Sequence, residues 1–111
     1  MHINTLSNGQ LDFLVATLEL IHPISYRRHG DSCIWGNGTI YSPTLDETTG
    51  CMILVRERLS VVPCEINGQL LWQAFHPKKP DNLYYGEYLP AAMKCYVAHV
   101  SGDEIDESVF I

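Results

Sequence analysis

Positive charge is scarce in this sequence: seven lysines and arginines stand against thirteen aspartates and glutamates, and the formal net charge is −6. Proteins that bind a nucleic-acid backbone irrespective of its sequence need a basic surface. Four of the acidic residues lie within 103–107, so the rest of the chain is only mildly acidic. The charge balance therefore argues against sequence-independent nucleic-acid binding, although it permits a local basic patch.

Long apolar runs and closely spaced cysteines are also absent. No apolar run approaches the roughly 20 residues that a membrane helix needs, and the first residues lack the features of a secretory leader. The four cysteines contain no Cys-x-x-Cys pair, which is the usual sign of a zinc site. Their even number allows disulfides, but without an oxidising compartment free thiols are favoured. We expect a cytoplasmic protein with no membrane association, no metal and no cofactor.

The first half of the chain begins with a predicted amphipathic helix. Ser7 and Gln10 have the spacing of a capping box, in which each side chain satisfies a backbone N–H at the helix start. Apolar residues then recur at helical spacing over 11–18. Pro23 is expected to stop the helix, because a proline pushes the residue before it out of helical geometry.

The middle of the chain predicts strands, which are rich in aromatic and β-branched residues and bounded by turn signals. The dipeptide Asn67-Gly68 accepts positive φ at both positions and therefore predicts a tight hairpin. The segment 76–85 contains two prolines and two lysines and predicts a long exposed loop. The predicted strands are 33–35, 40–41, 52–55, 61–66 and 70–75.

A second amphipathic helix is predicted near the end, with Pro90 close to its start and Gly102 at its end. The apolar face of an antiparallel sheet must be buried against another element, and the two predicted helices can cover it. The sequence thus predicts an α+β fold, in which an antiparallel sheet of three to four strands packs against two helices in helix–strands–helix order. We expect a single domain over 1–111, with 103–111 forming an acidic, frayed tail.

Several stretches match a known pattern in order and spacing. Residues 91–98, Ala-Ala-Met-Lys-Cys-Tyr-Val-Ala, give the closest match, and 41–44 form a Tyr-Ser-Pro-Thr segment. Together they resemble the NinX-type accessory protein family of lambdoid bacteriophages. The other matching stretches are 11–16, 50–57, 72–74 and 102–104.

The resemblance implies a biological setting more than a mechanism. It implies a small phage accessory protein that resides in the host cytoplasm and has no assigned reaction. Such proteins often counter host defence or modulate a host factor. The chain departs from the family at 45–47, where a tryptophan is usual, and at Met52, where a proline is usual.

Aromatic and basic residues supply the candidate binding groups. Three tyrosines within 84–88 are more than one core easily buries, and tyrosine suits interfaces because it offers rigid, amphipathic contact area. Two small basic clusters, 27–29 and 78–79, could recognise an anion or phosphate, with solvated loop charge as the alternative. The candidate ligand- or partner-binding residues are Tyr41, Ser42, Arg56, Trp72, Tyr84, Tyr85 and Tyr88.

No catalytic constellation is evident, so the sequence favours a non-enzymatic binding protein. Its expected partner is a host protein or a small nucleotide-like ligand, and a homo-oligomer is also considered. One alternative is a small thiol-dependent enzyme, since Cys95 and His99 share a helix face. However, Cys95 lacks the helix N-terminus or cation that activates a thiol. Another alternative is a double-stranded RNA-binding domain, which has a similar helix, three-strand, helix order.

Overall fold

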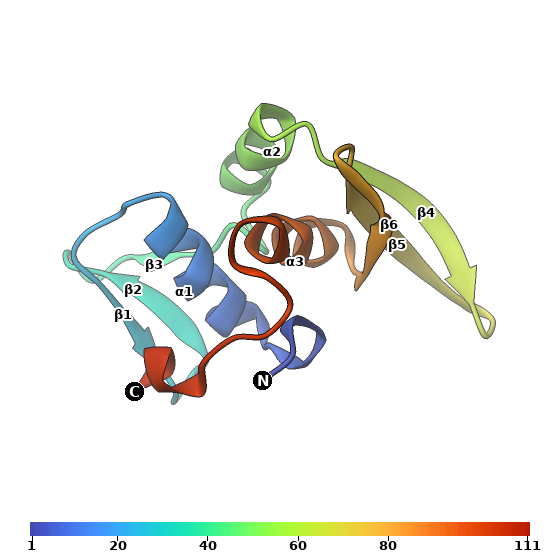
Figure 1. Cartoon of the computed structure of the whole chain (residues 1–111). Coiled ribbons are helices and arrows are strands. Elements are labelled where there is room, and N and C mark those ends of the chain that lie inside the picture. Colours follow the sequence, from blue (N-terminus) through green and yellow to red (C-terminus); the bar gives the residue numbers. More distant parts are fainter.

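Two three-stranded antiparallel sheets lie on opposite sides of the helices in the computed structural model, which describes all 111 residues (Figure 1). The helices are η1 (Ile3–Thr5), α1 (Asn8–Leu18), α2 (Glu47–Arg56), α3 (Tyr88–Ser101) and η2 (Glu107–Phe110). The first sheet contains β1 (Ile24–Arg27), β2 (Ser32–Trp35) and β3 (Ile40–Tyr41). The second contains β4 (Ser60–Ile66), β5 (Gln69–His76) and β6 (Lys79–Gly86). The α+β class is confirmed, whereas the predicted single sheet with two helices is wrong.

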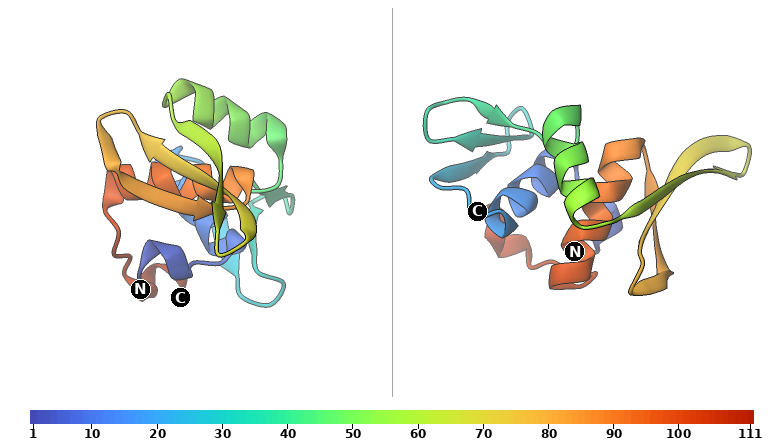
Figure 2. Two further views of the ribbon diagram at one scale, coloured as in Figure 1. Left: turned by 90° about the vertical axis from the view of Figure 1, so that its right-hand side faces the viewer. Right: turned by 90° about the horizontal axis from the view of Figure 1, so that it is seen from above.

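The core lies between the two sheets. Helix α1 packs on the first sheet and α3 packs on the second, and the two helices pack against each other (Figures 1 and 2). Helix α2 packs on α3. Nine of the 14 residues of α3 are buried. This helix is therefore central to the fold and is not an amphipathic helix with one face exposed to solvent. None of the helices is long and apolar enough to cross a membrane.

The start of α1 follows its sequence signal. The Gln10 backbone N–H donates to Ser7 Oγ at 3.2 Å, and the Ser7 N–H donates to Gln10 Oε1 at 3.0 Å. This confirms the capping box. The helix ends at Leu18, several residues before Pro23, and Leu20 then takes a positive φ of 58°. The chain therefore leaves the helix before the proline could terminate it.

The prediction of a buried strand at 52–55 is wrong, because these residues lie in α2. Asp46 caps this helix by accepting hydrogen bonds from Thr48 N and from Thr49 Oγ1. Ile53 is fully buried, but Met52 is 62% exposed. Met52 and Val55 are apolar although they are exposed, so the helical period is hidden in this part of the sequence.

The hairpin at Asn67-Gly68 is confirmed. The two residues have φ angles of 53° and 79°, and Ile66 pairs with Gln69 across the turn. In contrast, the long loop predicted over 76–85 is wrong, because most of it forms β6. This strand tolerates its early proline because it lies at the edge of the sheet, where a missing N–H breaks no ladder hydrogen bond.

The acidic segment after α3 packs on the body of the molecule, although we expected it to fray. The Asp103 carbonyl accepts a hydrogen bond from Ile3 N at 2.7 Å, and the Ile105 N–H donates to the Met1 carbonyl at 2.8 Å. Ile105 and Phe110 are buried in the core. The two apolar residues hold the segment in place, while its four acidic residues are exposed.

Candidate functional site

The seven predicted binding residues do not converge on one site. Six of them lie in three regions: a hollow beside β3, the contact between β5 and the start of α3, and a pocket between β6 and the end of α3. Arg56 lies apart from these, paired with Glu19 and Glu57. The residues concerned are Tyr41, Ser42, Arg56, Trp72, Tyr84, Tyr85 and Tyr88.

Tyr41 and Ser42 lie at the hollow beside β3. The Tyr41 ring is buried and meets Trp35 edge-on, with ring centroids 5.7 Å apart. Ser42 borders a hollow of about 340 Å³, and its carbonyl accepts a hydrogen bond from Asp46 N at 2.7 Å. Tyr41 is therefore mainly a core residue, and only the rim of this hollow is open.

Arg56 joins three helices. Its Nη1 and Nη2 donate to the two carboxylate oxygens of Glu19 at 2.6 and 2.7 Å, and its Nε donates to Glu57 at 2.8 Å. The Tyr96 hydroxyl donates to the same Glu19 carboxylate. The bond to Arg56 is the main cause that lowers the pKa of Glu19. Arg56 was predicted to bind a ligand or partner, and in the structure its guanidinium pairs with the carboxylates of Glu19 and Glu57.

Trp72 and Tyr88 contact each other where β5 meets the start of α3. Their ring centroids are 4.9 Å apart and the rings are nearly perpendicular. Tyr88 is 37% exposed and borders an open groove of about 390 Å³ together with Glu87. Tyr85 is half-buried, and its carbonyl accepts a hydrogen bond from Lys94 Nζ at 3.0 Å. These rings are partly accessible, but the groove beside them has no cationic side chain.

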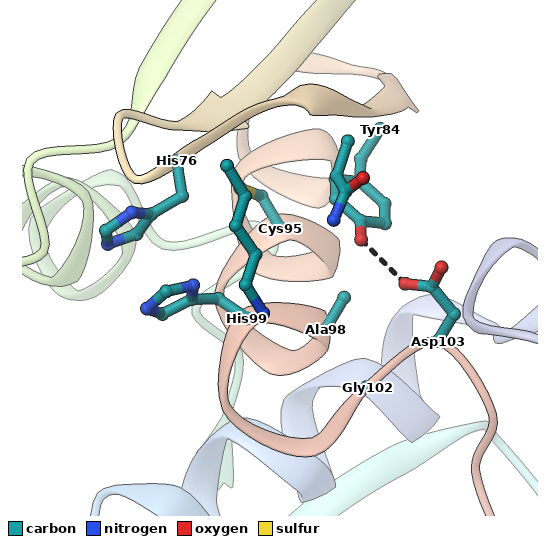
Figure 3. Close-up of a pocket in the computed structure, with 9 residues that line it drawn as sticks. His76, Tyr84, Cys95, Ala98, His99, Gly102 and Asp103 are labelled. Atoms are coloured by element: carbon teal, nitrogen blue, oxygen red, sulfur yellow. Dashed lines mark hydrogen bonds between the residues drawn. The ribbon is translucent and has the colours of Figure 1, made fainter.

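Tyr84 lies in the third region, which we call the β6–α3 pocket. Its ring is 6% exposed, and its hydroxyl donates to Asp103 Oδ1 at 2.6 Å (Figure 3). The pocket has a volume of about 130 Å³, which suits a small charged group. It is lined by His76, Lys79, Asn82, Tyr84, Cys95, Ala98, His99, Gly102 and Asp103.

Two imidazoles stack at one side of the β6–α3 pocket. His76, from the end of β5, lies on His99 of α3 with ring centroids 3.6 Å apart and an angle of 5° between the planes (Figure 3). Burial lowers the pKa of His99, and the positive charges of His76, Lys79 and Lys78 lower it further. His99 Nδ1 is buried without a hydrogen-bond partner. The pocket therefore gathers several cationic or protonatable groups around one imidazole that has an unused polar atom.

Cys95 borders the same pocket but has the properties of an inert thiol. It is 1% exposed, and burial raises its pKa to about 12. No hydrogen bond joins it to His99. A thiol with this pKa carries almost no thiolate at neutral pH, and the thiolate is the nucleophile. The arrangement gives no support to thiol catalysis.

This difference between cysteines is measurable. We expect Cys95 and the buried Cys33 to resist an aromatic disulfide reagent in the native protein, while the half-buried Cys51 reacts. Unfolding in urea should release both buried thiols. Rapid native modification of Cys95 at neutral pH would contradict its assignment as a packed residue and would revive the thiol-enzyme alternative.

The sequence contains part of the signal for the β6–α3 pocket. The i, i+4 spacing of Cys95 and His99 places both on one helix face, and Lys79 belongs to a recognised basic cluster. Asn82 and Asp103 were missed, because β6 was expected to be a loop and 103–111 a frayed tail. A loop assignment gives no side-chain directions, whereas a strand beside α3 does.

The order of elements also bears on the RNA-binding alternative, which depended on a helix, three strands and a helix. The chain has a further helix, α2, and two separate sheets.

No family model matches the sequence, and no curated protein matches it. The resemblance to the NinX-type family therefore stays a prediction.

Proposed function

We propose that the protein is a non-catalytic accessory protein that sequesters a small nucleotide-like ligand, and that it holds the ligand's phosphate group in the β6–α3 pocket. The observation that carries this proposal is the convergence of His76, Lys79 and His99 on one small pocket in a chain of net charge −6. A phage origin and a role against host defence are parts of the same proposal, and the resemblance to the NinX-type family supports them.

The electrostatics favour an anionic ligand. Lys79 supplies a fixed positive charge, and His99 becomes positive on protonation. Asp103 is the one carboxylate at the pocket, and the Tyr84 hydroxyl already donates to it. An anion beside the stacked imidazoles would offset their mutual repulsion and would accept a hydrogen bond from the protonated ring. Because the pocket is small, only the charged group fits inside, and the rest of the ligand must lie at the mouth.

The absence of an activated nucleophile favours binding over catalysis. Cys95 is the only thiol at the pocket, and its raised pKa keeps it protonated. The Tyr84 hydroxyl is held by Asp103, and burial raises its pKa further above the ordinary value. Neither group provides the nucleophile and base pair that covalent catalysis requires.

Binding of sulfate and adenosine monophosphate tests the proposal directly. We expect Lys79→Ala and His99→Gln each to weaken binding at least about tenfold, which corresponds to about 1.4 kcal/mol. Sulfate affinity should rise as the pH falls from about 8 to about 5, because an anion binds better to protonated His99. Sulfate keeps its charge over this range, so the pH dependence belongs to the protein. Isothermal titration calorimetry measures both effects.

Lys78→Ala is the matched control, because it removes the same charge from the neighbouring residue, which does not line the pocket. We expect it to change the affinity by no more than about twofold, since exposed charges interact weakly across solvent. Equal losses from both lysine variants would indicate unspecific attraction. Failure of both anions to bind at millimolar concentration would refute the proposed function.

A further inference from the structure

The β6–α3 pocket has a carboxylate opposite its imidazoles, which is unexpected for a site that binds an anion. Figure 3 shows His76 and His99 on one side of the pocket, with Tyr84 and Asp103 on the other. Two negative groups repel each other, so a carboxylate weakens the binding of an anion that can only accept hydrogen bonds. An anion that carries a proton avoids this cost, because its own O–H donates to the carboxylate in a charge-assisted hydrogen bond.

The structure holds the Asp103 carboxylate in place and leaves one of its oxygens unused. The Tyr84 hydroxyl donates to Oδ1 at 2.6 Å, and the Tyr84 side chain is buried. The Asp103 backbone is held as well, since its carbonyl accepts a hydrogen bond from Ile3 N at 2.7 Å. No group of the chain donates to Oδ2. The carboxylate is therefore positioned and can still accept a hydrogen bond from a ligand.

We propose that the β6–α3 pocket selects a phosphate group that carries a proton, and that Asp103 accepts the hydrogen bond from its P–O–H group. Lys79 and protonated His99 then donate to the bare oxygens of the same phosphate. This inference rests on the proposed function and narrows its ligand class. A nucleoside monophosphate and inorganic phosphate qualify, because a phosphate monoester keeps its last proton up to about pH 6. A cyclic nucleotide or another phosphodiester has no such proton, and neither has sulfate.

The size of the pocket favours one group that supplies both the donor and the acceptors. A volume of about 130 Å³ accommodates one small charged group. A separate ammonium group on the ligand could also donate to Asp103, but Lys79 and the imidazoles would repel it. A protonated phosphate is a negative group that donates from one oxygen and accepts at the others, so it matches both sides of the pocket.

Isothermal titration calorimetry with four anions at about pH 5 tests the inference. Inorganic phosphate and sulfate have the same tetrahedral shape, and adenosine monophosphate and its cyclic form share the base and the net charge at this pH. Only the first anion of each pair carries a proton. We expect the wild type to bind the protonated anion at least about tenfold more tightly in each pair. Sulfate has the higher charge, so simple attraction to the cationic groups would favour sulfate instead. Tighter binding of adenosine monophosphate than of inorganic phosphate would identify a nucleotide as the source of the phosphate group.

Asp103→Asn should remove the preference, because an amide can donate to an unprotonated oxygen and keeps an oxygen that accepts from the Tyr84 hydroxyl. We expect sulfate and cyclic adenosine monophosphate to bind at least about fivefold more tightly to this variant, with a ratio of about two or less within each pair. Glu104→Gln is the matched control. It removes the same charge from the neighbouring residue, which is exposed and does not line the pocket, and it should leave both ratios unchanged.

The outcomes separate this inference from the proposed function. Equal or inverted affinities within the wild-type pairs, or a preference that survives Asp103→Asn, would overturn the inference and leave the proposed function standing. Failure of all four anions to bind would refute the proposed function and the inference with it. Circular dichroism shows whether the variants fold, and the wild-type ratios decide the matter even if Asp103→Asn does not.

Discussion

Replacement of Gly9 by alanine should lower the free energy of unfolding by about 3 kcal/mol, at the upper end of the range for overpacking. Gly9 lies in the first turn of α1 and is buried against the turn between β1 and β2. A methyl group there would overlap the backbone carbonyl of Asp31, which cannot rotate away, and would lie 2.6 Å from Asp31 Oδ1. Helix and turn must separate, which weakens the hydrogen bond from Gly9 N to Asp31 Oδ2.

Urea unfolding measures this loss, and the melting temperature should fall by about 15 °C. Asn8→Ala is the control, because Asn8 is the adjacent residue, is exposed, and loses atoms in the change instead of gaining any. We expect this change to alter stability by no more than about 0.5 kcal/mol. If both variants are equally stable, the close contact between α1 and the β1–β2 turn is wrong.

The second large effect concerns Asp12, whose carboxylate is buried inside the molecule. Asp12 is 4% exposed and accepts hydrogen bonds from Thr44 N at 3.0 Å and from Thr44 Oγ1 at 3.1 Å. Burial raises its pKa from 3.8 to about 6 in the folded chain. Between about pH 4 and 6, the folded state therefore binds a proton that the unfolded state has released. Asp12 should make the protein about 2 kcal/mol more stable at pH 4 than at pH 7.

Asp12→Asn should remove this dependence, because the amide keeps the shape and does not ionise. The difference in unfolding free energy between wild type and variant should change by about 2 kcal/mol from pH 7 to pH 4, with the wild type gaining on acidification. All other carboxylates are common to both proteins, so their titration cancels in the difference. Parallel pH profiles would show that Asp12 keeps an ordinary pKa.

The sequence predicts an element well when its signal is local. The capping box at Ser7 and the hairpin at Asn67-Gly68 depend on side-chain and backbone chemistry within four residues, and both are present. The apolar run over 52–55 was misassigned because Met52 is exposed yet apolar, so hydrophobicity did not report burial. The fold class could therefore be predicted, while the number of helices and sheets could not.

The candidate site depends on contacts that composition does not encode. Tyr84 and Tyr85 are neighbours in sequence, but strand alternation places the first at the β6–α3 pocket and the second on the opposite face of the sheet. The guanidinium of Arg56 is a group that can bind a phosphate. In the structure it donates to Glu19, which lies 37 positions away in the sequence. Only the packing of α1 and α2 on α3 brings these groups together. The sequence identifies the basic residues, but it does not show which of them are free to bind a ligand.

The central position of α3 also governs how the chain can reach this structure. The strands of each sheet are joined by short turns, so either sheet can form from nearby residues. About 70 residues separate the end of α1 from the start of α3, and bringing them together closes a long loop at an entropic cost. Because contacts between distant segments slow folding, the meeting of these two helices should set the folding rate.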